Sequence, residues 1–84
     1  MSFNVKFKKS VARDLKRIDK NQTERILGKI DEELPDKAES FPVLSGKFSG
    51  LRKFRVGDYR VIYSIIGDTA LILRISHRRE AYKK

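Results

Sequence analysis

The chain has 84 residues, no cysteine and a formal charge of +9, from twenty Lys and Arg against eleven Asp and Glu. This length predicts one small domain over residues 1–84, and the lack of cysteine excludes disulfides and thiolate metal sites and favours the cytoplasm. One histidine and no close carboxylate cluster argue against a metal or other cofactor, and no apolar run approaches the roughly 20 residues of a membrane span.

The first predicted element is a strand over residues 3–7, FNVKF. Phe3, Val5 and Phe7 alternate with polar residues, which is typical of a half-buried strand. Lysines at positions 6, 8 and 9 interrupt the segment before an apolar region develops. No signal peptide is therefore expected.

Two amphipathic helices are predicted next. Ser10 is expected to cap the first helix, and Asn21, with Glu24 three residues later, resembles a capping box that opens the second. Their apolar stripes are Val11, Leu15 and Ile18 in the first helix and Ile26, Leu27, Ile30 and Leu34 in the second. Pro35 is expected to stop the second helix or to begin a separate turn, and residues 35–50 are expected to form an irregular connection.

Three strands joined by two tight turns are predicted in the second half of the chain. Gly57-Asp58 and Gly67-Asp68 separate the segments LRKFRV, YRVIYSII and TALILRIS. Glycine in the first position of a two-residue loop suits a type II′ hairpin turn. The element order predicts an α+β fold, in which two helices pack on one face of a sheet containing a three-stranded antiparallel β-meander.

The two-residue turns fix the pairing of these strands. In the first hairpin, we expect Arg55 opposite Arg60 and Val56 opposite Tyr59. The pairs expected in the second hairpin are Ile66 with Thr69, Ile62 with Leu73 and Arg60 with Ile75. Alternation then assigns to the helix-covered face Phe54, Val56, Tyr59, Val61, Tyr63 and Ile65.

The opposite face gathers positive charge. Lys53, Arg55 and Arg60 lie on it above apolar residues, and His77 reaches the same end of the face when the last strand has no bulge. Like charges opposite each other destabilise a sheet, so this cluster predicts a phosphate-binding site. Residues 52–84 hold nine Lys and Arg against three acids, which favours RNA, DNA or an acidic protein as partner over a membrane surface.

The segment LRKFRVGDYRVIY, followed by HRREAY, resembles the RelE-type toxins of bacterial and archaeal toxin–antitoxin systems. The resemblance includes the chain length and the order of elements, so it covers essentially the whole chain. The hairpin is typical of the wider RelE/ParE superfamily, and the HRR..Y ending points towards its RelE side. This resemblance implies a ribosome-dependent mRNA endonuclease that inhibits translation and is held inactive by a cognate antitoxin.

The resemblance also implies roles for individual residues. Lys53 and Arg55 fall on a basic strand that contacts phosphate and transfers protons, and Arg60 matches an active-site arginine. The candidate catalytic residues are Lys53, Arg60, His77, Arg78 and Tyr82, and the candidate phosphate-binding residues are Arg52, Arg55 and Arg79. Leu51 replaces a lysine of the best-known member, so the general base is either Lys53 or His77.

RNA can be cut without a metal when its 2′-hydroxyl attacks the adjacent phosphorus. This step needs a base for the hydroxyl proton, cations for the charge that develops, and an acid for the departing 5′-oxygen. Arginines hold phosphate oxygens with paired donors, as Arg55 and Arg60 can do here. Arg78 or His77 can assist the leaving group, and Tyr82 can stack on a base.

Two other functions stay open. A ParE-like toxin would use the same fold to inhibit DNA gyrase, although the retained set of Lys53, Arg60, Arg78 and Tyr82 argues against it. The second open function is a non-catalytic domain that binds RNA or antitoxin. It stays open because no residue is an unambiguous proton acceptor. The charge predicts an acidic antitoxin as partner, and the nuclease function adds mRNA and the ribosome.

Overall fold

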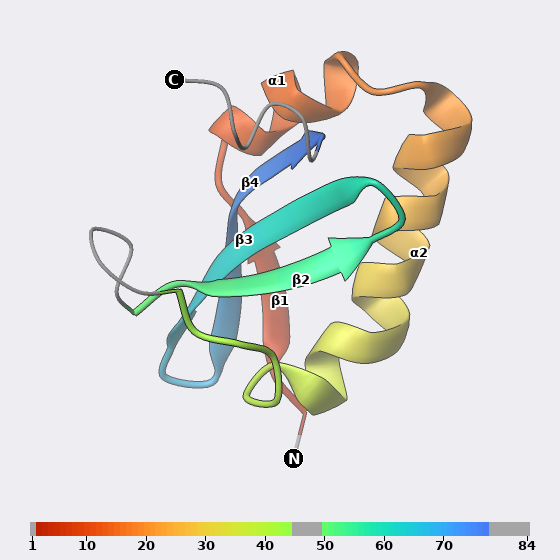
Figure 1. The fold of residues 1–84 in the computed structure, drawn as a ribbon. Helices are drawn as coiled ribbons and strands as arrows, with labels where there is room; N and C mark the ends of the chain where they lie inside the picture. The colour runs from red at the N-terminus through yellow and green to blue at the C-terminus, as the bar shows by residue number, and fades with distance from the viewer. Residues whose placement is uncertain (1, 45–49, 78–84) are drawn as a thin grey trace.

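The computed structural model describes residues 2–44 and 50–77. The elements follow the predicted order: β1 (Asn4–Phe7), α1 (Ser10–Lys16), α2 (Lys20–Lys37), β2 (Arg52–Val56), β3 (Tyr59–Ile66) and β4 (Thr69–His77). They form one four-stranded sheet with both helices packed against it, so the predicted α+β class is confirmed (Figure 1). No helix within the described ranges is long and apolar enough to cross a membrane.

β1 joins the sheet beside β4 and runs parallel to it, in the strand order β1-β4-β3-β2. The sequence predicted this strand but not its neighbour. Parallel neighbours need a long crossover, which the two helices and the meander supply. The amide of Phe3 donates to the carbonyl of Pro35 at 2.7 Å and ties the start of β1 to the last turn of α2.

The observed N-caps precede the predicted ones by one residue in α1 and by two residues in α2. Lys9 is the N-cap of α1 and makes no side-chain cap bond, so Ser10 is the first helical residue and not a cap. Asp19 caps α2, and its carboxylate accepts from the Asn21 amide at 3.2 Å. The predicted capping box of Asn21 and Glu24 is therefore wrong, because an equally good capping side chain precedes it.

Helix α2 continues through Pro35 to Lys37, so the predicted stop at the proline is also wrong. Proline removes one backbone donor, whose acceptor would be the carbonyl of Asp31. Asp31 is exposed, and water can therefore satisfy that carbonyl. The last turn is held by burial, because Leu34 and Ala38 are both 0% exposed against the sheet.

Both Gly-Asp turns have the predicted geometry. Gly57 has a φ of 58° and Gly67 a φ of 62°, and no non-glycine residue in the described ranges has a positive φ. A positive φ followed by a negative one is the signature of a type II′ turn. The first hairpin consequently has the predicted register, with Arg55 opposite Arg60.

The core lies between the helices and the inner face of the sheet, which is the side that faces α1 and α2. The helices contribute Val11, Ile26, Ile30, Leu34 and the adjoining Ala38, and the strands contribute Phe54, Val56, Val61, Tyr63, Ala70, Ile72 and Ile75. Tyr59 and Ile65 pack at its edge. The predicted inner faces of β2 and β3 are thus confirmed.

Tyr63 is the largest fully buried side chain among the described residues. Its hydroxyl donates to the carbonyl of Ala38, the C-cap of α2, at 2.5 Å. Burial raises the pKa of this hydroxyl to about 12, and the positive charge of Arg52 opposes part of that rise. The bond connects the middle of the sheet to the end of the helix that contains Pro35.

Candidate nucleic-acid interface

Three cations predicted to share one face of the sheet do so. Lys53 and Arg55 belong to β2 and Arg60 to β3, and alternation puts all three on the outer face, away from the helices. Arg55 is directly opposite Arg60, while Lys53 is opposite Ile62 and therefore diagonal to Arg60. Directly opposed residues of such a ladder are about 5 Å apart and diagonal ones about 7 Å, so one phosphate group can reach all three.

A bulge in β4 changes which of its residues lie on the outer face of the sheet. Ile66 pairs with Thr69 as predicted, but the register shifts between Ile62 and Tyr63. The pairs that follow are Ile62 with Arg74 and Arg60 with Ser76, so the predicted pairs of Ile62 with Leu73 and of Arg60 with Ile75 are wrong. Leu73 is the extra residue, and Arg74 takes its place on the outer face.

The cost of burying a cation explains the bulge. In a regular ladder Arg74 would lie opposite Val61, inside the core, where an unpaired guanidinium costs several kcal/mol. The extra residue gives Val61 the partner Ile75 instead, which is 2% exposed. Arg74 was missed from the sequence, although the unbroken apolar run at 71–73 signals a break in alternation. We call Lys53, Arg55, Arg60 and Arg74 the outer basic face.

The same bulge moves His77 to the inner side of the sheet. It pairs with Tyr59, and the two rings meet edge to face with centroids 5.2 Å apart. His77 therefore does not join the outer basic face, as it would in a regular ladder. Of the two candidate bases, Lys53 is the one that lies among the arginines.

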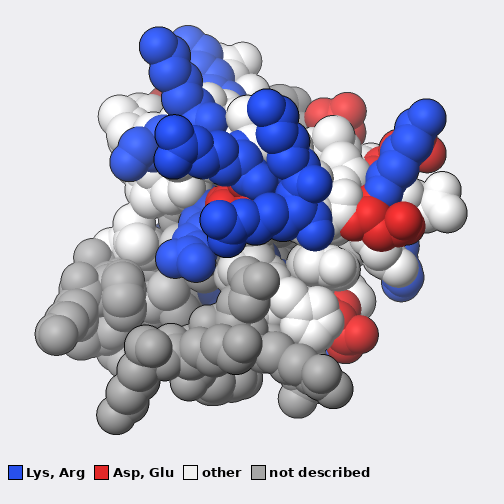
Figure 2. Space-filling model, turned by 90° about the horizontal axis from the view of Figure 1, so that it is seen from above, with Lys and Arg blue, Asp and Glu red and all other residues white. Residues whose placement is uncertain are grey.

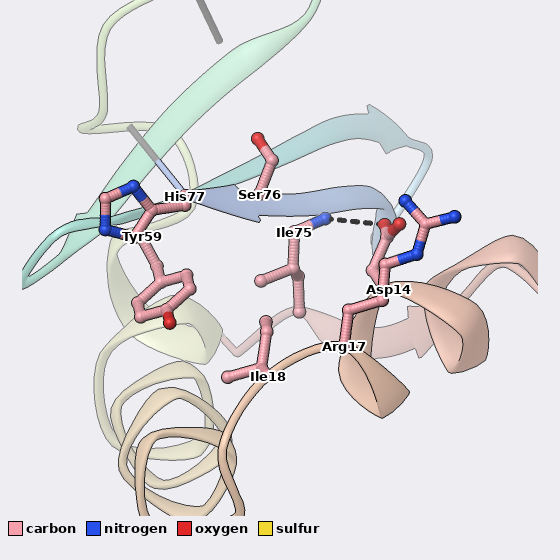
Figure 3. Close-up of a pocket in the computed structure, with 7 residues that line it drawn as sticks. All are labelled: Asp14, Arg17, Ile18, Tyr59, Ile75, Ser76 and His77. Carbon is pink, nitrogen blue, oxygen red and sulfur yellow. Dashed lines mark hydrogen bonds between the residues drawn. The ribbon is translucent and has the colours of Figure 1, made fainter. Parts of the chain in front are cut away.

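A pocket of about 220 Å³ lies between α1 and the ends of β3 and β4, on the inner side of the sheet (Figure 3). It is lined by Asp14, Arg17, Ile18, Tyr59, Ile75, Ser76 and His77. Asp14 accepts a hydrogen bond from the amide of Ile75 at 3.0 Å. Because β1 ends opposite Ile72, this part of β4 pairs with β3 on one side but has no β1 residue beside it on the other, where the carboxylate substitutes for a strand partner.

Two arginines predicted to bind phosphate have different surroundings. Arg52 donates through Nη1 to the carbonyls of Glu39 and Phe41, at 3.0 and 2.8 Å, and so holds the connection after α2 against the sheet. Arg55 is exposed and donates through Nε to the carbonyl of Gly57 at 3.1 Å. Arg52 is therefore separated from the outer basic face, and Arg55 belongs to it.

The remaining predicted site residues, Arg78, Arg79 and Tyr82, lie outside the described residues. Their roles stay predictions. Within residues 2–44 and 50–77, no cluster of His, Asp and Glu side chains could hold a metal ion.

A comparison with protein families finds a match over almost the whole chain. Residues 5–82 match the family model of the ParE toxin of the type II toxin–antitoxin system, parDE. A comparison with curated proteins finds no match.

Solved structures agree with the family model. A chain of the RelBE2 toxin–antitoxin complex from Mycobacterium tuberculosis is 25% identical, with a TM-score of 0.86 over 93% of this chain and 100% of that one. A chain of the archaeal RelE–RelB complex from Pyrococcus horikoshii is 34% identical, with a TM-score of 0.67 over 93% and 97% of the two chains. A chain of the ParDE system from P. aeruginosa shares the fold, with a TM-score of 0.75 at 17% identity over 90% and 96%.

Proposed function

The chain belongs to the ParE toxin family, within the RelE/ParE superfamily of type II toxin–antitoxin toxins, and from this premise we propose that it is a ribosome-dependent mRNA endonuclease. The observation that carries the proposal is the outer basic face. Its four cations lie on three adjacent strands, with Lys53, Arg55 and Arg74 around Arg60, and β2, β3 and β4 contain no Asp or Glu. Such a face suits a phosphate group on which negative charge increases during the reaction.

The reaction is a transesterification within the RNA. The 2′-oxygen bonds to phosphorus as its proton passes to the base, the bond from phosphorus to the 5′-oxygen breaks, and that oxygen takes a proton from the acid. The products are a 2′,3′-cyclic phosphate and a 5′-hydroxyl. No metal is needed, because cations supply the charge stabilisation.

Each residue of the outer basic face has a role in this step. Lys53 is the base or a direct electrostatic stabiliser, since His77, the other candidate base, lies on the opposite side of the sheet from the outer basic face. Arg60 and Arg55 hold the phosphate, because a planar guanidinium matches two phosphate oxygens at once. Arg74 adds charge on the β4 side. Arg78 and Tyr82 keep the roles predicted for them, at the leaving group and on a base.

The partners follow from this reaction. Translating ribosomes carry the mRNA, so the protein acts in the cytoplasm. An acidic antitoxin that covers the outer basic face would neutralise it and block RNA, and the neighbouring structures from M. tuberculosis and P. horikoshii are themselves toxin–antitoxin complexes.

The test is a translating extract in which mRNA 5′ ends are mapped. We expect ribosome-dependent cuts within codons that leave 5′-hydroxyl ends, and loss of at least 100-fold in cutting rate, on the order of an electrostatic catalytic group, for Arg60→Ala. Arg60→Lys should recover only part of the rate, because it restores charge but not paired donation. Lys29→Ala is the matched control, since it removes one exposed cation from α2.

A second candidate function, inhibition of DNA gyrase, is favoured by one observation, the ParE description of the family model. Supercoiling by purified gyrase, measured with the same protein preparation, separates the two. Inhibited gyrase with intact mRNA would replace the nuclease proposal. Intact mRNA and active gyrase, with RNA still bound, would indicate a non-catalytic binding domain.

A further inference from the structure

A second basic surface lies over α1, apart from the outer basic face. Lys and Arg side chains gather at the end of the molecule that carries this helix (Figure 2). Six exposed cations of residues 8–20 form it, and we call them the α1 basic patch: Lys8, Lys9, Arg13, Lys16, Arg17 and Lys20. The reaction proposed above uses none of them.

The two acids within this segment, Asp14 and Asp19, offset only part of the charge of the patch. Asp14 accepts from the amide of Ile75, and Asp19 accepts from the amide of Asn21 as the cap of α2. None of the six cations forms an ion pair within the described ranges. Six cations against these two carboxylates leave residues 8–20 with a net charge of +4.

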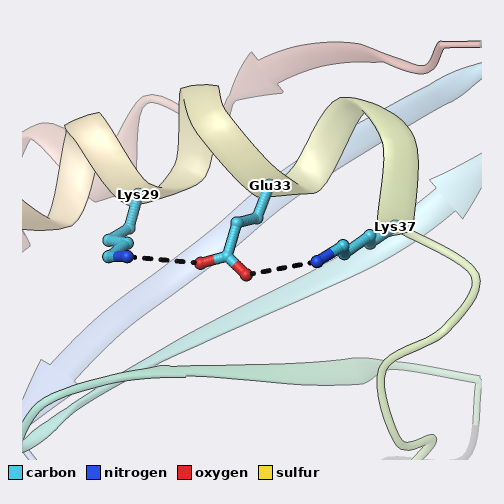
Figure 4. Close-up of polar contacts among 3 residues, drawn as sticks. All are labelled: Lys29, Glu33 and Lys37. Carbon is cyan, nitrogen blue, oxygen red and sulfur yellow. Dashed lines mark ion pairs between the residues drawn. The ribbon is translucent and has the colours of Figure 1, made fainter.

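Helix α2 shows the ordinary alternative. Over residues 20–37 it carries four Lys and Arg and five Asp and Glu. Glu33 sits between Lys29 and Lys37 and pairs with each at 3.8 Å (Figure 4). In α1 the matching spacings put like charges together, Lys9 with Arg13 and Arg13 with Arg17, an arrangement that destabilises a helix. An anionic ligand would supply the negative charge that α1 lacks and would relieve this repulsion.

The chemistry of the patch selects among anionic partners. A membrane surface needs an apolar helix face to insert, and the apolar face of α1 packs into the core through Val11 and Leu15. A stable protein interface needs aromatic or aliphatic anchors at its centre, and the only exposed apolar residue of α1 is Ala12. A nucleic-acid backbone needs neither, because phosphate contacts alone bind it.

The spacing of the cations fits a phosphate backbone. Helical geometry extends from Lys9 to Arg17, since both caps have helical φ and ψ. The eight helical steps from Lys9 to Arg17 span about 12 Å. A nucleic-acid strand carries a phosphate every ~3.4 Å along a double helix, so this length faces three or four phosphates.

We propose that the α1 basic patch binds the phosphate backbone of double-stranded nucleic acid, independently of the outer basic face. The binding itself does not depend on the proposed function. The assignment of the ligand as folded ribosomal RNA does rest on that function. The patch then anchors the protein on the ribosome while the outer basic face meets the mRNA.

The test measures binding of a short fluorescent RNA hairpin to the purified protein at several salt concentrations, with a DNA hairpin of the same sequence beside it. The test variant is Lys9→Gln with Arg13→Gln. We expect it to lower affinity for both hairpins about tenfold and to reduce the salt slope by about two, one for each lost phosphate contact. The control is Lys29→Gln with Lys37→Gln, which removes the same charge from α2 and should change affinity less than about twofold.

Four outcomes would overturn the proposal. The first two are an unchanged hairpin affinity in the α1 variant and an equal loss of hairpin affinity in the α2 variant. The other two are an α1 variant that keeps its hairpin affinity but loses binding to polyglutamate, and one that keeps it but loses binding to phosphatidylserine vesicles. Circular dichroism confirms that both variants are folded. The hairpin measurement needs neither ribosomes nor cleavage, so it stands or fails separately from the nuclease proposal.

A kinetic readout distinguishes anchoring from catalysis. In the translating extract, the α1 variant should need about tenfold more ribosomes for half-maximal cutting, with the same rate at saturation. Lys53→Gln with Arg60→Gln should show the reverse, losing the saturating rate without a change in the ribosome concentration needed for half-maximal cutting. A loss of saturating rate in the α1 variant would contradict an anchoring role.

Discussion

The two faces of the sheet carry opposite chemistry although the same strands form both. On β3, Val61 and Tyr63 point inward and are 0% exposed, while their neighbours Arg60 and Ile62 point outward and are half-buried. On the inner face, burial restricts each position to apolar side chains, or to one whose polar atom has a partner. On the outer face, charges of one sign accumulate in spite of their repulsion.

This difference shows that burial on the inner face determines the register of the backbone, while the outer face is free of that constraint and can carry charge. The bulge at Leu73 is the clearest case. The backbone changes its register there, which removes Arg74 from the core and adds it to the outer basic face. Stability and activity should consequently separate between adjacent residues of one strand.

The largest expected effect is a charge placed on the inner face. Val61→Asp buries a carboxylate without a partner, at a cost of several kcal/mol, which is enough to unfold a domain whose whole stability is about 5–15 kcal/mol. Ile62→Asp, one residue away on the outer face, should cost about 1 kcal/mol or less. Urea unfolding followed by circular dichroism compares the two, and equal losses would show that the faces are not distinct.

Removal of one buried hydroxyl should have the next largest effect. Tyr63→Phe leaves the Ala38 carbonyl without its donor and should lower the free energy of unfolding by about 1–3 kcal/mol at neutral pH. Tyr59→Phe is the control, because that ring lies at the edge of the core. Thermal and urea unfolding measure both, and a neutral Tyr63→Phe would mean that the bond does not stabilise the fold.

The same hydroxyl predicts a dependence on alkaline pH. Burial raises the pKa of Tyr63 from 10.0 to about 12, so the folded state favours the protonated form. Its contribution is fully present below pH 10 and is lost as the pH rises towards 12, by up to about 3 kcal/mol. The stability difference between wild type and Tyr63→Phe, measured from pH 9 to pH 12, should therefore shrink; a constant difference would contradict the shift.

Substitution of Arg74 should affect activity, and substitution of Arg52 should affect stability. Arg74→Ala removes a cation from the outer basic face and should lower mRNA cutting about tenfold, with little change in stability. Arg52→Ala removes two hydrogen bonds to carbonyls and should lower stability by about 1–2 kcal/mol, with the cutting rate of the folded protein unchanged. If Arg52→Ala also reduces cutting in the folded protein, the phosphate contact predicted for it from the sequence is correct.

The smallest effect is expected from deleting Leu73. Without it, Arg74 follows Ile72 directly and lies on the outer face of a regular ladder, while Ile75 stays in the core. The expected loss is about 1 kcal/mol, from the part-buried leucine side chain. Deleting Ile62 is the control, since it turns Tyr63 outward and should unfold the protein. Equal tolerance of both deletions would show that the bulge does not protect the inner face.

Much of the fold could be predicted because its signals are local. Two Gly-Asp pairs specify type II′ turns, and those turns set the register of the first hairpin and the meeting of Arg55 with Arg60. The apolar stripes of the helices gave the core positions Ile26, Ile30 and Leu34. The errors at Ser10, Asn21 and Pro35 are errors of boundary, where neighbouring residues compete for the same role.

The candidate site divides in the same way. Sequence alone determined that Lys53, Arg55 and Arg60 share one face, because a two-residue turn and strict alternation leave a single arrangement. Only the tertiary structure decided that Arg74 joins them, that His77 lies across the sheet and that Arg52 is held by carbonyls. The reason is that a bulge, a sheet neighbour and a distant carbonyl depend on the free energy of burying particular groups in the assembled core. The alternation of apolar and polar residues along the sequence does not report that free energy.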